Sequence, residues 1–487
     1  MLLSTIVFLP VAGAILLAIM PGGRPAAIRW TAAIVTIVTF VLSMILFQSF
    51  DFNTLQPQFV VKTPWIPALN IQYYLGVDGI SLPMVVLTTL LGFLAILVSW
   101  HIERRVKEYF IWLLVLETGV LGVFTALDFF LFFLFWEVEL LPMFFLISIW
   151  GTPPPLGRRE YSAWKFLIYT IFGSAFMLVG ILLLYFSAGT FDIIQLGSMN
   201  VTQTLVPVQL IFWLIFFAFA VKLPMFPLHT WLPDAHTDAP TAVSVILAGV
   251  LLKMGGYGII RTCVTIFPEV AQQYAPILAT LAVVNVLYGA LVTIRQTDMK
   301  RLIAYSSVSH MGFVLLGIAA LTPVGLSGAV LQMFTHGTIT GLLFALVGLV
   351  YDKTHLRDVT RLRGLAHHMP FIAVCFVIAG LASLGLPGMS GFVSELLVFL
   401  GAFEVNAVAA ILSTLGILLT AGYILWMLER VFFRERDDHY AGVGDATFVE
   451  KVPLIVLIAI TFLIGVQPWL LTDIIEAGIR PVLERLG

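Results

Sequence analysis

A few ionisable side chains interrupt long apolar stretches of this sequence, where a membrane or a protein interior would surround them. Placing one charged residue at the centre of a membrane helix costs about 2.5–3.5 kcal/mol, so such residues are functional candidates by default. Carboxylates, amines and imidazoles each take up and release protons, and a row of them joined by water conducts protons. The residues that we predict to form such a relay are Glu117, Glu137, Lys222, Lys253, His310, His336 and Glu395.

Glu137 lies eight residues into the apolar stretch 129–150 and is followed by thirteen more residues of that stretch. A charged side chain near a helix end can extend to water, but this depth makes that rescue difficult. Glu117 also lies in the middle of an apolar stretch. Glu139, two residues after Glu137, faces a different side of the same helix, and its role stays open.

Two of the ionisable residues stand beside predicted breaks in their helices. Lys222 is followed by Pro224 and Pro227, and each proline removes a backbone donor and clashes with the preceding turn. Glu395 follows the segment GLPGMSG, which should also interrupt its helix. Irregular backbone inside a membrane is tolerated only where it is buried in protein or lines a polar cavity. A charged residue at such a break is therefore typical of an ion pathway.

Lys253 and the two central histidines, His310 and His336, complete the predicted relay. Glycines flank Lys253 and allow another helix to approach closely. A buried histidine often does no more than satisfy its own hydrogen bonds, but the company of lysines and carboxylates favours a functional role here. His229 and His236, in PLHTWLPDAH, lie near one mouth of the bundle, where they either gate entry or only structure the loop.

The elements that must hold these side chains are membrane helices. The chain has 487 residues, 60% hydrophobic and 11% charged, with a mean hydropathy of +1.04, whereas soluble chains carry about 25% charged residues. A net charge of −2 gives no sign of nucleic-acid binding, and Cys263 and Cys375 have no metal-ligand spacing. We predict an all-α polytopic membrane protein with about 14 transmembrane helices, of which helices 7 and 12 are broken. The predicted spans are 3–20, 30–47, 80–100, 110–127, 129–150, 166–188, 208–228, 242–260, 277–294, 302–320, 326–350, 371–400, 407–428 and 453–470.

Lysine and arginine sort sharply between the two sets of loops. The loops after odd-numbered spans hold 19 of the 25 and the opposite loops hold only 4, while Lys222 and Lys253 lie inside spans. By the positive-inside rule the odd loops are cytoplasmic and both termini lie on the non-cytoplasmic side. We expect the protein in a bacterial-type inner membrane or another energy-transducing membrane.

Two equal spacings indicate an internal repeat. Glu137 precedes Lys222 by 85 residues, and His310 precedes Glu395 by the same number. Spans 4–8 and 9–13 would then be two five-helix units, and a shift by an odd number of spans makes the two repeats inverted. Within one membrane domain, 1–487, the first repeat would cover 108–265 and the second 275–433, flanked by 1–107 and 452–487. The Leu-Pro dipeptides at the two breaks align at a different offset, which counts against the repeat.

Several long motifs in these regions resemble the antiporter-like subunits of respiratory complex I. They are FWEVELLPMFFLI, AVKLPMFPLHTWLPDAHTDAPTAVSVILAGVLLKMGGYGIIR, MKRLIAYSSVSHMGF, FTHG and GLPGMSGFVSE, and the resemblance covers nearly the whole chain. Glutamate instead of lysine at the second break is similar to the M type, the counterpart of mitochondrial subunit 4. The resemblance implies an ion pair of Glu137 with Lys222 and a connecting role for Lys253. It also implies relay roles for the residues His310, His336 and Glu395.

That resemblance implies a proton-translocating membrane-arm subunit of a redox-driven NADH:quinone oxidoreductase, acting as a non-redox part of the translocase. The sequence contains no nucleotide motif, cluster ligand set or flavin signature, so we expect no cofactor in this chain. FMN, iron–sulfur clusters and quinone are expected in partner subunits. The expected partners are other membrane subunits of the complex, especially those of the L and N types, within the lipid bilayer.

Other hypotheses use the same residues differently. A subunit of a multi-subunit cation/proton (Na⁺/H⁺) antiporter would need no redox partner, and co-purification would distinguish it. A redox membrane subunit could hold a haem between His310 and His336, but lysines and carboxylates are poor company for a haem. A scaffold without transport would carry buried charges costing about 10 kcal/mol or more in total, with nothing to offset them. The electron donor, and the choice between protons and sodium, are not encoded in recognisable motifs.

Overall fold

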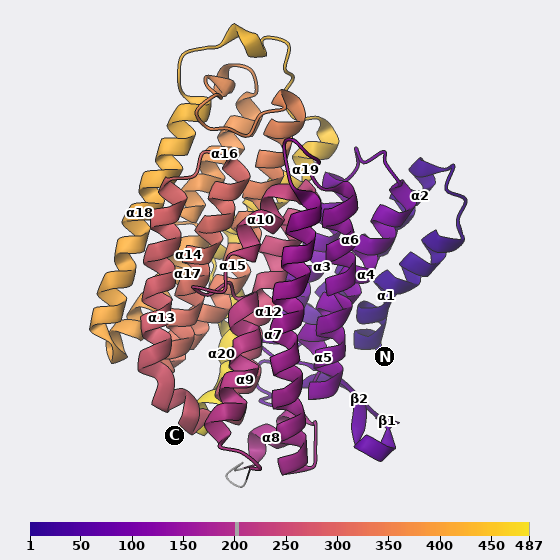
Figure 1. Cartoon of the computed structure of the whole chain (residues 1–487), viewed down its shortest axis with the longest axis vertical. Coiled ribbons are helices and arrows are strands. Elements are labelled where there is room, and N and C mark those ends of the chain that lie inside the picture. The colour runs from indigo at the N-terminus through magenta and orange to yellow at the C-terminus, as the bar shows by residue number, and fades with distance from the viewer. Residues whose placement is uncertain (200–203, 487) are drawn as a thin grey trace.

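A computed structural model of the chain describes residues 1–199 and 204–486, and most of them form helices that run side by side in one bundle (Figure 1). The helices up to residue 264 are α1 (Leu2–Ile19), α2 (Pro25–Gln48), α3 (Ser81–Val98), α4 (Val106–Thr125), α5 (Phe129–Val138), α6 (Leu140–Trp150), α7 (Arg159–Ala188), α8 (Ile193–Ser198), α9 (Val208–Lys222), α10 (Trp231–Asp238), α11 (Thr241–Ile246) and α12 (Leu252–Gly258). The later helices are α13 (Pro268–Ile294), α14 (Met299–Ala320), α15 (Pro323–Thr354), α16 (Pro370–Ser383), α17 (Ser390–Val405), α18 (Ala407–Phe432), α19 (Phe448–Val466) and α20 (Trp469–Leu486). The two strands are β1 (Gln58–Ile66) and β2 (Ile71–Val77).

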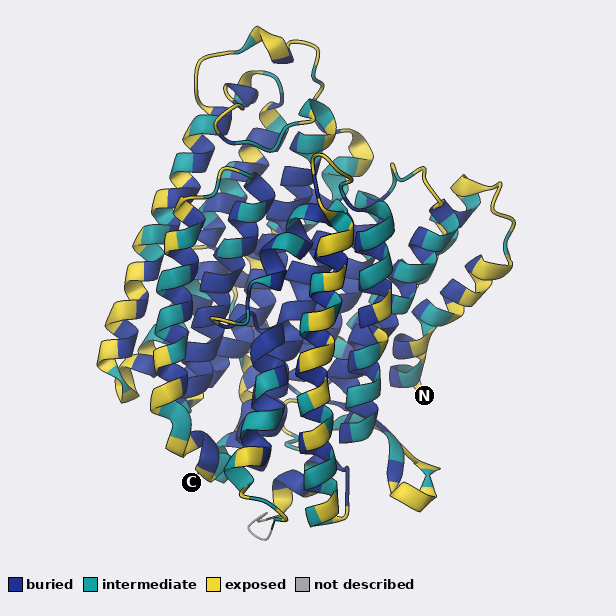
Figure 2. Cartoon of the chain, in the orientation of Figure 1, coloured by how far each residue is buried: buried dark blue, intermediate teal, exposed yellow. Residues whose placement is uncertain are grey.

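The bundle is apolar outside as well as inside, which identifies lipid as its solvent. Exposed residues follow the outer helices (Figure 2), and the large side chains Ile168, Phe186 and Leu418 are each more than 60% exposed. Helices α14 and α15 lie in the middle and bury nearly every residue. A water-facing protein could not leave such surfaces uncovered. The predicted polytopic membrane protein is confirmed.

Twelve helical segments in the described part of the chain are long and apolar enough to cross a membrane, counting 129–150 and 241–264 as one segment each, and they coincide with twelve of the predicted spans. Two shorter apolar helices, α9 and α16, begin the two spans that were predicted to be broken. The full count of fourteen therefore stays a prediction. Both termini lie in the lower half of the bundle in Figure 1, together with the β-hairpin. The loops after odd-numbered spans, which carry most of the lysine and arginine, lie at the upper end, which we term the basic face.

Both predicted breaks are present. The chain leaves the helical conformation after Lys222, the last residue of α9, and resumes it at Trp231, the first residue of α10. Residues 384–389 separate α16 from α17. Gly385 and Gly388 of this second break have φ angles of 78° and 91°, a conformation that glycine adopts readily and other residues rarely do.

Further interruptions surround the ionisable residues, and the sequence pattern did not predict them. The span 129–150 is divided at Glu139, because Pro142 has no N–H to offer the carbonyl of Val138. Lys253 lies in α12 between two π-helical turns, Leu247–Leu251 and Ile259–Val264. Such π-helical turns are frequent at functional sites.

Each half of the chain contains the same short backbone connection. Asp128, which precedes α5, forms an antiparallel bridge with Asp192, and Asp298, which precedes α14, forms one with Asp358. Asp128 and Asp298 also cap the helices that follow them by accepting hydrogen bonds from their backbone N–H groups. The connection at Asp128 follows an even-numbered span and the connection at Asp298 follows an odd-numbered span. The two connections therefore lie on opposite faces of the membrane bundle. This match favours the inverted repeat, whose bounds stay a prediction.

Two elements lie outside the all-helical spans that the sequence predicted. Strands β1 and β2 pair antiparallel, and Lys62 of this hairpin forms an ion pair of 2.7 Å with Asp192. The amphipathic helix α20 follows the last span and buries Ile475 and Gly478 among its apolar residues, in contact with α15 and α13. Short strands and an amphipathic helix do not form long apolar stretches, so hydropathy does not reveal them.

Helix α20 approaches the start of α3 so closely that only glycine fits there. A Cβ atom on Gly79 would overlap the carbonyl oxygen of Ile474 and lie 2.6 Å from the backbone nitrogen of Gly478. We expect Gly79→Ala to lower the melting temperature of the purified protein in detergent, because such overpacking costs about 1–3 kcal/mol. Gly422→Ala is the matched control, since a Cβ there meets nothing within 4 Å. Equal melting temperatures for the two variants would contradict the contact.

Candidate functional site

Lys222 forms a buried ion pair with Glu139 at the break in its span. The Lys222 Nζ contacts Glu139 Oε1, and neither side chain is more than 1% exposed. As the last residue of α9, Lys222 places its cation at the partially negative end of that helix. The rings of Trp136 and Phe166 lie 5.4 and 5.6 Å from Nζ and add cation–π attraction.

The structure corrects the predicted pairing of Lys222 with Glu137. Glu137 is only partly buried, forms no ion pair among the described residues, and has an Oε1 without a hydrogen-bond partner there. The helix is interrupted at Glu139, and of the two glutamates only Glu139 lies within contact distance of the Lys222 Nζ. Apolar residues flank both, and the sequence pattern therefore did not show which one does. Pro142, three residues after Glu139, was the available sign of an irregular helix at that position.

Asn285 of α13 holds the backbone that follows Lys222. Its Oδ1 accepts a hydrogen bond of 2.7 Å from the N–H of Phe226. Its Nδ2 donates one of 3.0 Å to the carbonyl of Val308 on α14. A single buried side chain thus joins the break beside Lys222 to the helix that carries His310.

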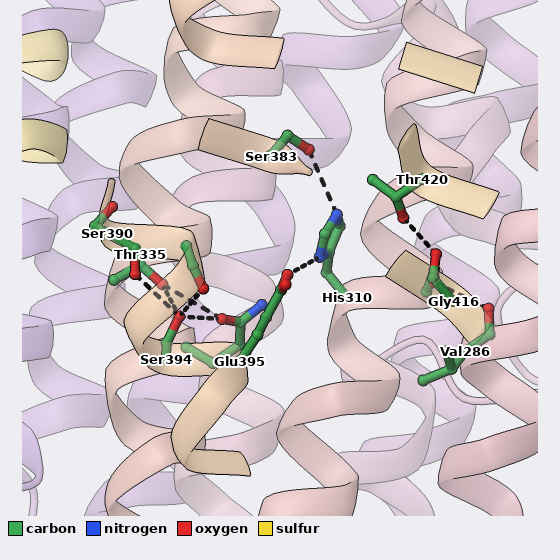
Figure 3. Close-up of polar contacts among 12 residues, drawn as sticks. Val286, His310, Thr335, Ser383, Ser390, Ser394, Glu395, Gly416 and Thr420 are labelled. Atoms are coloured by element: carbon green, nitrogen blue, oxygen red, sulfur yellow. Dashed lines mark hydrogen bonds and ion pairs between the residues drawn. The ribbon is translucent and has the colours of Figure 1, made fainter. Parts of the chain in front are cut away.

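His310 and Glu395 form a second buried pair, beside the other break (Figure 3). The Nδ1 of His310 lies 3.4 Å from Glu395 Oε1, and its Nε2 lies 3.5 Å from the hydroxyl of Ser383. Gly385 provides the space for this carboxylate, because a Cβ on it would lie 2.7 Å from Glu395 Oε2. The break in span 12 therefore forms part of the wall around the acidic group.

Ser394, the residue before Glu395, joins α17 to α15. Its hydroxyl is hydrogen-bonded to Thr335 Oγ1 at 2.9 Å, as Figure 3 shows, and also to Gln332 Oε1. These contacts fix the rotation of α17 about its axis. They therefore keep Glu395 directed toward His310.

Lys253 contacts the second central histidine. Its Nζ lies 2.7 Å from Nδ1 of His336 and also donates to the carbonyl of Ala248, in the first π-helical turn. Lys253 is completely buried and His336 is 3% exposed. The lysine therefore has two partners and no access to water on the surface.

The two histidines bring these contacts into one row, in the order Lys253, His336, His310, Glu395. The ring centroids of His336 and His310 are 5.5 Å apart. A cavity lined by both rings, Ser383 and Glu395 leaves about 10 Å³ for the centres of water molecules, which is enough for about one. The Nε2 of His336 has no hydrogen-bond partner among the described residues. A water in this cavity would therefore find both donors and acceptors.

The pair at Lys222 is separate from this row. Among the described residues, no chain of hydrogen bonds or ion pairs connects Lys222 to Lys253. Their helices nevertheless touch, since a Cβ on Gly255 would lie 2.7 Å from the backbone nitrogen of Leu223. The glycines beside Lys253 thus allow the close approach that the sequence predicted.

Glu117 stands apart from all these groups. It is 3% exposed, and its Oε1 has no hydrogen-bond partner in the described part of the chain. It lies against Gly92 of α3, where a Cβ would be 2.6 Å from its carboxyl carbon. Of the seven predicted relay residues, the structure therefore brings four into one row, pairs Lys222 with Glu139, and leaves Glu117 and Glu137 outside.

His229 and His236, whose roles the sequence left open, are both buried inside the bundle. Neither ring has a hydrogen-bond partner among the described residues. His229 lies 5.0 Å from the ring of Tyr288, and His236 stacks on Phe344 of α15 with a centroid separation of 4.5 Å. Unpartnered buried imidazoles are uncommon and require an explanation.

Comparisons with known sequences show which family of proteins this chain is similar to. Residues 126–420 match a family model described as NADH:quinone oxidoreductase/Mrp antiporter, TM. The chain is 46% identical to NADH-quinone oxidoreductase subunit M of Rhodobacter capsulatus, over 99% of this chain and 96% of that protein. It is 44% identical to NAD(P)H-quinone oxidoreductase chain 4 1 of Synechococcus elongatus, over 97% and 90% of the two chains.

Solved structures agree with the sequence comparisons. A chain of respiratory complex I from Thermus thermophilus with bound NADH is 30% identical, with a TM-score of 0.89 over 100% of both chains. A chain of the Mrp complex from Dietzia sp. is 22% identical, with a TM-score of 0.86 over 100% of this chain and 99% of that one, and it shows a shared fold alone. This protein belongs to the family of antiporter-like membrane subunits of NADH:quinone oxidoreductase, in its subunit M (chain 4) branch.

Proposed function

We propose that this chain is a proton-translocating membrane subunit of a complex I-type NADH:quinone oxidoreductase. The observation that carries the proposal is the buried row of Lys253, His336, His310 and Glu395 in the middle of an apolar bundle. An apolar environment makes such a row costly, and proton conduction explains why it is retained. Membership of the family also supports the proposal, because its members are subunits of an enzyme complex.

Each group of the row can pass a proton to the next. Lys253, as an ammonium, donates to Nδ1 of His336, and a neutral imidazole that takes a proton at one nitrogen releases one from the other. A water in the central cavity and His310 accept in turn. Glu395, beside the broken helix, ends the row as the acceptor carboxylate.

The pair of Lys222 and Glu139 acts in this proposal as a charge switch. While the carboxylate touches Nζ, the ammonium form is stabilised, and separating the two leaves a charge in an apolar site that favours proton release. The close approach of α9 and α12 at Gly255 shortens the path from Lys222 to Lys253. Glu117 and Glu137, which lie outside the pair and the row, are proposed as additional proton-binding groups.

Electron transfer takes place in partner subunits under this proposal. The described residues hold no group of three or more metal-ligating side chains, and Cys263 and Cys375 are both buried on different spans, so they do not fit an iron–sulfur cluster. FMN, iron–sulfur clusters and quinone belong to the partners, and L- and N-type subunits are the proposed membrane neighbours. The basic face is the cytoplasmic one, and both termini lie on the other side.

A subunit of a multi-subunit cation/proton antiporter is the second candidate. The matching family description names Mrp antiporters, and the Dietzia chain shares the fold. Identities of 46% and 44% to subunit M and chain 4 proteins favour the first candidate.

Replacing Lys253 by methionine tests the row. Lys253→Met keeps the length of the side chain but cannot carry a proton, so we expect electron-driven proton translocation in membrane vesicles to fall about tenfold or more. Arg434→Met, at an exposed loop residue, is the control and should pump normally. Normal pumping by a fully assembled Lys253→Met complex would refute the relay.

A double-mutant cycle tests which glutamate partners Lys222. Breaking a buried ion pair from one side costs about 3–5 kcal/mol, whereas removing both charges together costs much less. We therefore expect Lys222→Met to rescue the thermal stability lost in Glu139→Gln, but not that lost in Glu137→Gln. If Lys222→Met rescued Glu137→Gln alone, the result would instead support the pairing of Lys222 with Glu137 that the sequence predicted. The melting temperature of the purified complex is the measurement.

Affinity purification of the tagged chain from its native membrane tests which kind of complex the chain belongs to. A complex I-type subunit should bring down partners whose absorption and paramagnetic resonance spectra show flavin and iron–sulfur clusters. A set of purely membrane-embedded partners without these spectra would favour the antiporter instead.

A further inference from the structure

Five basic residues gather at one corner of the basic face, outside the pair and the row described above. Helices α1 and α2 lie at one side of the bundle, on the right in Figure 1, and the corner is formed where their connecting loop meets the loop between α3 and α4. The residues come from two segments, 18–34 and 99–108, and we term them the basic corner: Arg24, Arg29, Arg104, Arg105 and Lys107.

Hydrogen bonds between the two segments hold the basic corner together. Lys107 Nζ donates bonds of 2.7 and 3.0 Å to the carbonyls of Ala18 and Met20, at the end of α1. The guanidinium of Arg29 donates one of 2.9 Å to the carbonyl of Ile102, in the second segment. The bonded residues are 73 or more positions apart in the sequence, so it is the fold that brings these cations to one place.

A third contact fixes the backbone of the second segment. The indole Nε1 of Trp150, the last residue of α6, donates a hydrogen bond of 2.6 Å to the carbonyl of Arg104. The guanidinium carbon of Arg105 lies 5.9 Å from the centre of the same indole ring. The main chain of Arg104 is therefore held in place while its side chain extends from it.

The basic corner carries more positive charge than the surrounding residues neutralise. Arg24 and Arg104 are exposed, and within the described residues neither side chain forms an ion pair or a hydrogen bond. The Nε of Arg29 is buried and also has no hydrogen-bond partner there. Against the five cations, the two segments contain only two carboxylates, Glu103 and Glu108. The corner therefore attracts an anion from outside the chain.

Tryptophans and apolar residues place the basic corner at the edge of the membrane. Trp30 is 60% exposed and packs against Trp100, with ring centroids 5.1 Å apart. Tryptophan is enriched at the depth of the lipid headgroups. Ile19, at the end of α1, and Ile34, one turn after Trp30, are both exposed. Acyl chains of the membrane therefore reach the same end of the helices as the arginines.

We propose that the basic corner binds an anionic phospholipid from the leaflet at the basic face, with its phosphate on Arg24, Arg29 and Arg104. Guanidinium groups bind phosphate oxygens through pairs of parallel N–H groups. Helices α2 and α4 both begin at this corner, so their partially positive ends add to the attraction. The acyl chains of the lipid lie against Ile19 and Ile34.

A phospholipid of this class satisfies both features of the corner at once. Its phosphate offsets the unpaired cations, and its acyl chains cover the exposed apolar residues beside them. A zwitterionic lipid would add an ammonium group to a region that already has an excess of positive charge. Clusters of lysine and arginine next to a membrane span are a known means of attracting anionic lipids. The site does not depend on proton translocation.

Photo-crosslinking in the assembled complex tests the lipid site. The complex is reconstituted in phosphatidylcholine vesicles that contain a trace of a phosphatidylglycerol analogue with a photoreactive group on its acyl chain. Mass spectrometry should locate crosslinks on the segments 18–34 and 99–108. Excess phosphatidylglycerol should suppress these crosslinks, whereas additional phosphatidylcholine, or inorganic phosphate at equal ionic strength, should leave them unchanged.

Replacing the two exposed arginines tests the part played by charge. Each basic residue near the membrane surface strengthens the binding of anionic lipid by about fivefold, so Arg24→Gln combined with Arg104→Gln should lower crosslinking at the corner by about tenfold or more. Arg434→Gln combined with Arg436→Gln is the matched control. These two arginines are also exposed on the basic face, but each already forms an ion pair of 3.0 Å, with Glu429 and Asp438. The control should crosslink as the unmodified complex does.

Four results would overturn the lipid site. Equal suppression by phosphatidylcholine would show lipid contact without selectivity, and suppression by inorganic phosphate would show a site for free phosphate. An absence of crosslinks at the corner would show that a partner subunit covers it, and unchanged crosslinking in the Arg24→Gln, Arg104→Gln variant would show that these charges do not bind the lipid.

Salt dependence of the unmodified complex decides the question if the double variant fails to assemble. Raising the salt concentration should weaken crosslinking at the corner, because salt screens the attraction between exposed charges. Crosslinking that is independent of salt would refute the site. Proton translocation is not measured in any of these experiments, so the lipid site and the proposed function can fail separately.

Discussion

An apolar solvent offers no hydrogen bonds, so charges and free backbone groups inside this bundle have to find their partners in the protein itself. The three central contacts, Lys222 with Glu139, Lys253 with His336 and His310 with Glu395, each join two different spans. The cost of burying a charge thereby fixes how the helices are rotated and how closely they approach. Removing one partner would leave the other charge in a site that cannot solvate it.

The breaks in the helices follow from the same constraint. At the first break Trp231 donates a hydrogen bond of 3.0 Å to the carbonyl of Val221, which satisfies a group that a continuous helix would have used. Asn285 supports the rest of that segment. Each break therefore creates a small polar region inside the apolar bundle, and the charged residue stands at its edge.

The buried charges are divided into a separate pair and a row, and this division suits a protein that must not let protons return across the membrane. A permanent hydrogen-bonded chain across the membrane would let protons return along the gradient that the complex builds. Here Lys222 and Lys253 lie on helices in contact without a direct bond between them, and the two histidine rings are separated by a space for about one water. Small movements of helices, driven by partner subunits, can connect and disconnect such a chain.

Apolar length and proline or glycine chemistry can be read along the chain, so the sequence predicts the class of protein, twelve of the spans and both helix breaks. It also singled out the ionisable residues, since each one interrupts an apolar stretch. The contact of Lys222 with Glu139 and the position of His336 between Lys253 and His310 became visible in the folded chain alone. These outcomes depend on the rotation of each helix about its axis. Helices that are apolar on every side carry no periodic pattern that would reveal that rotation.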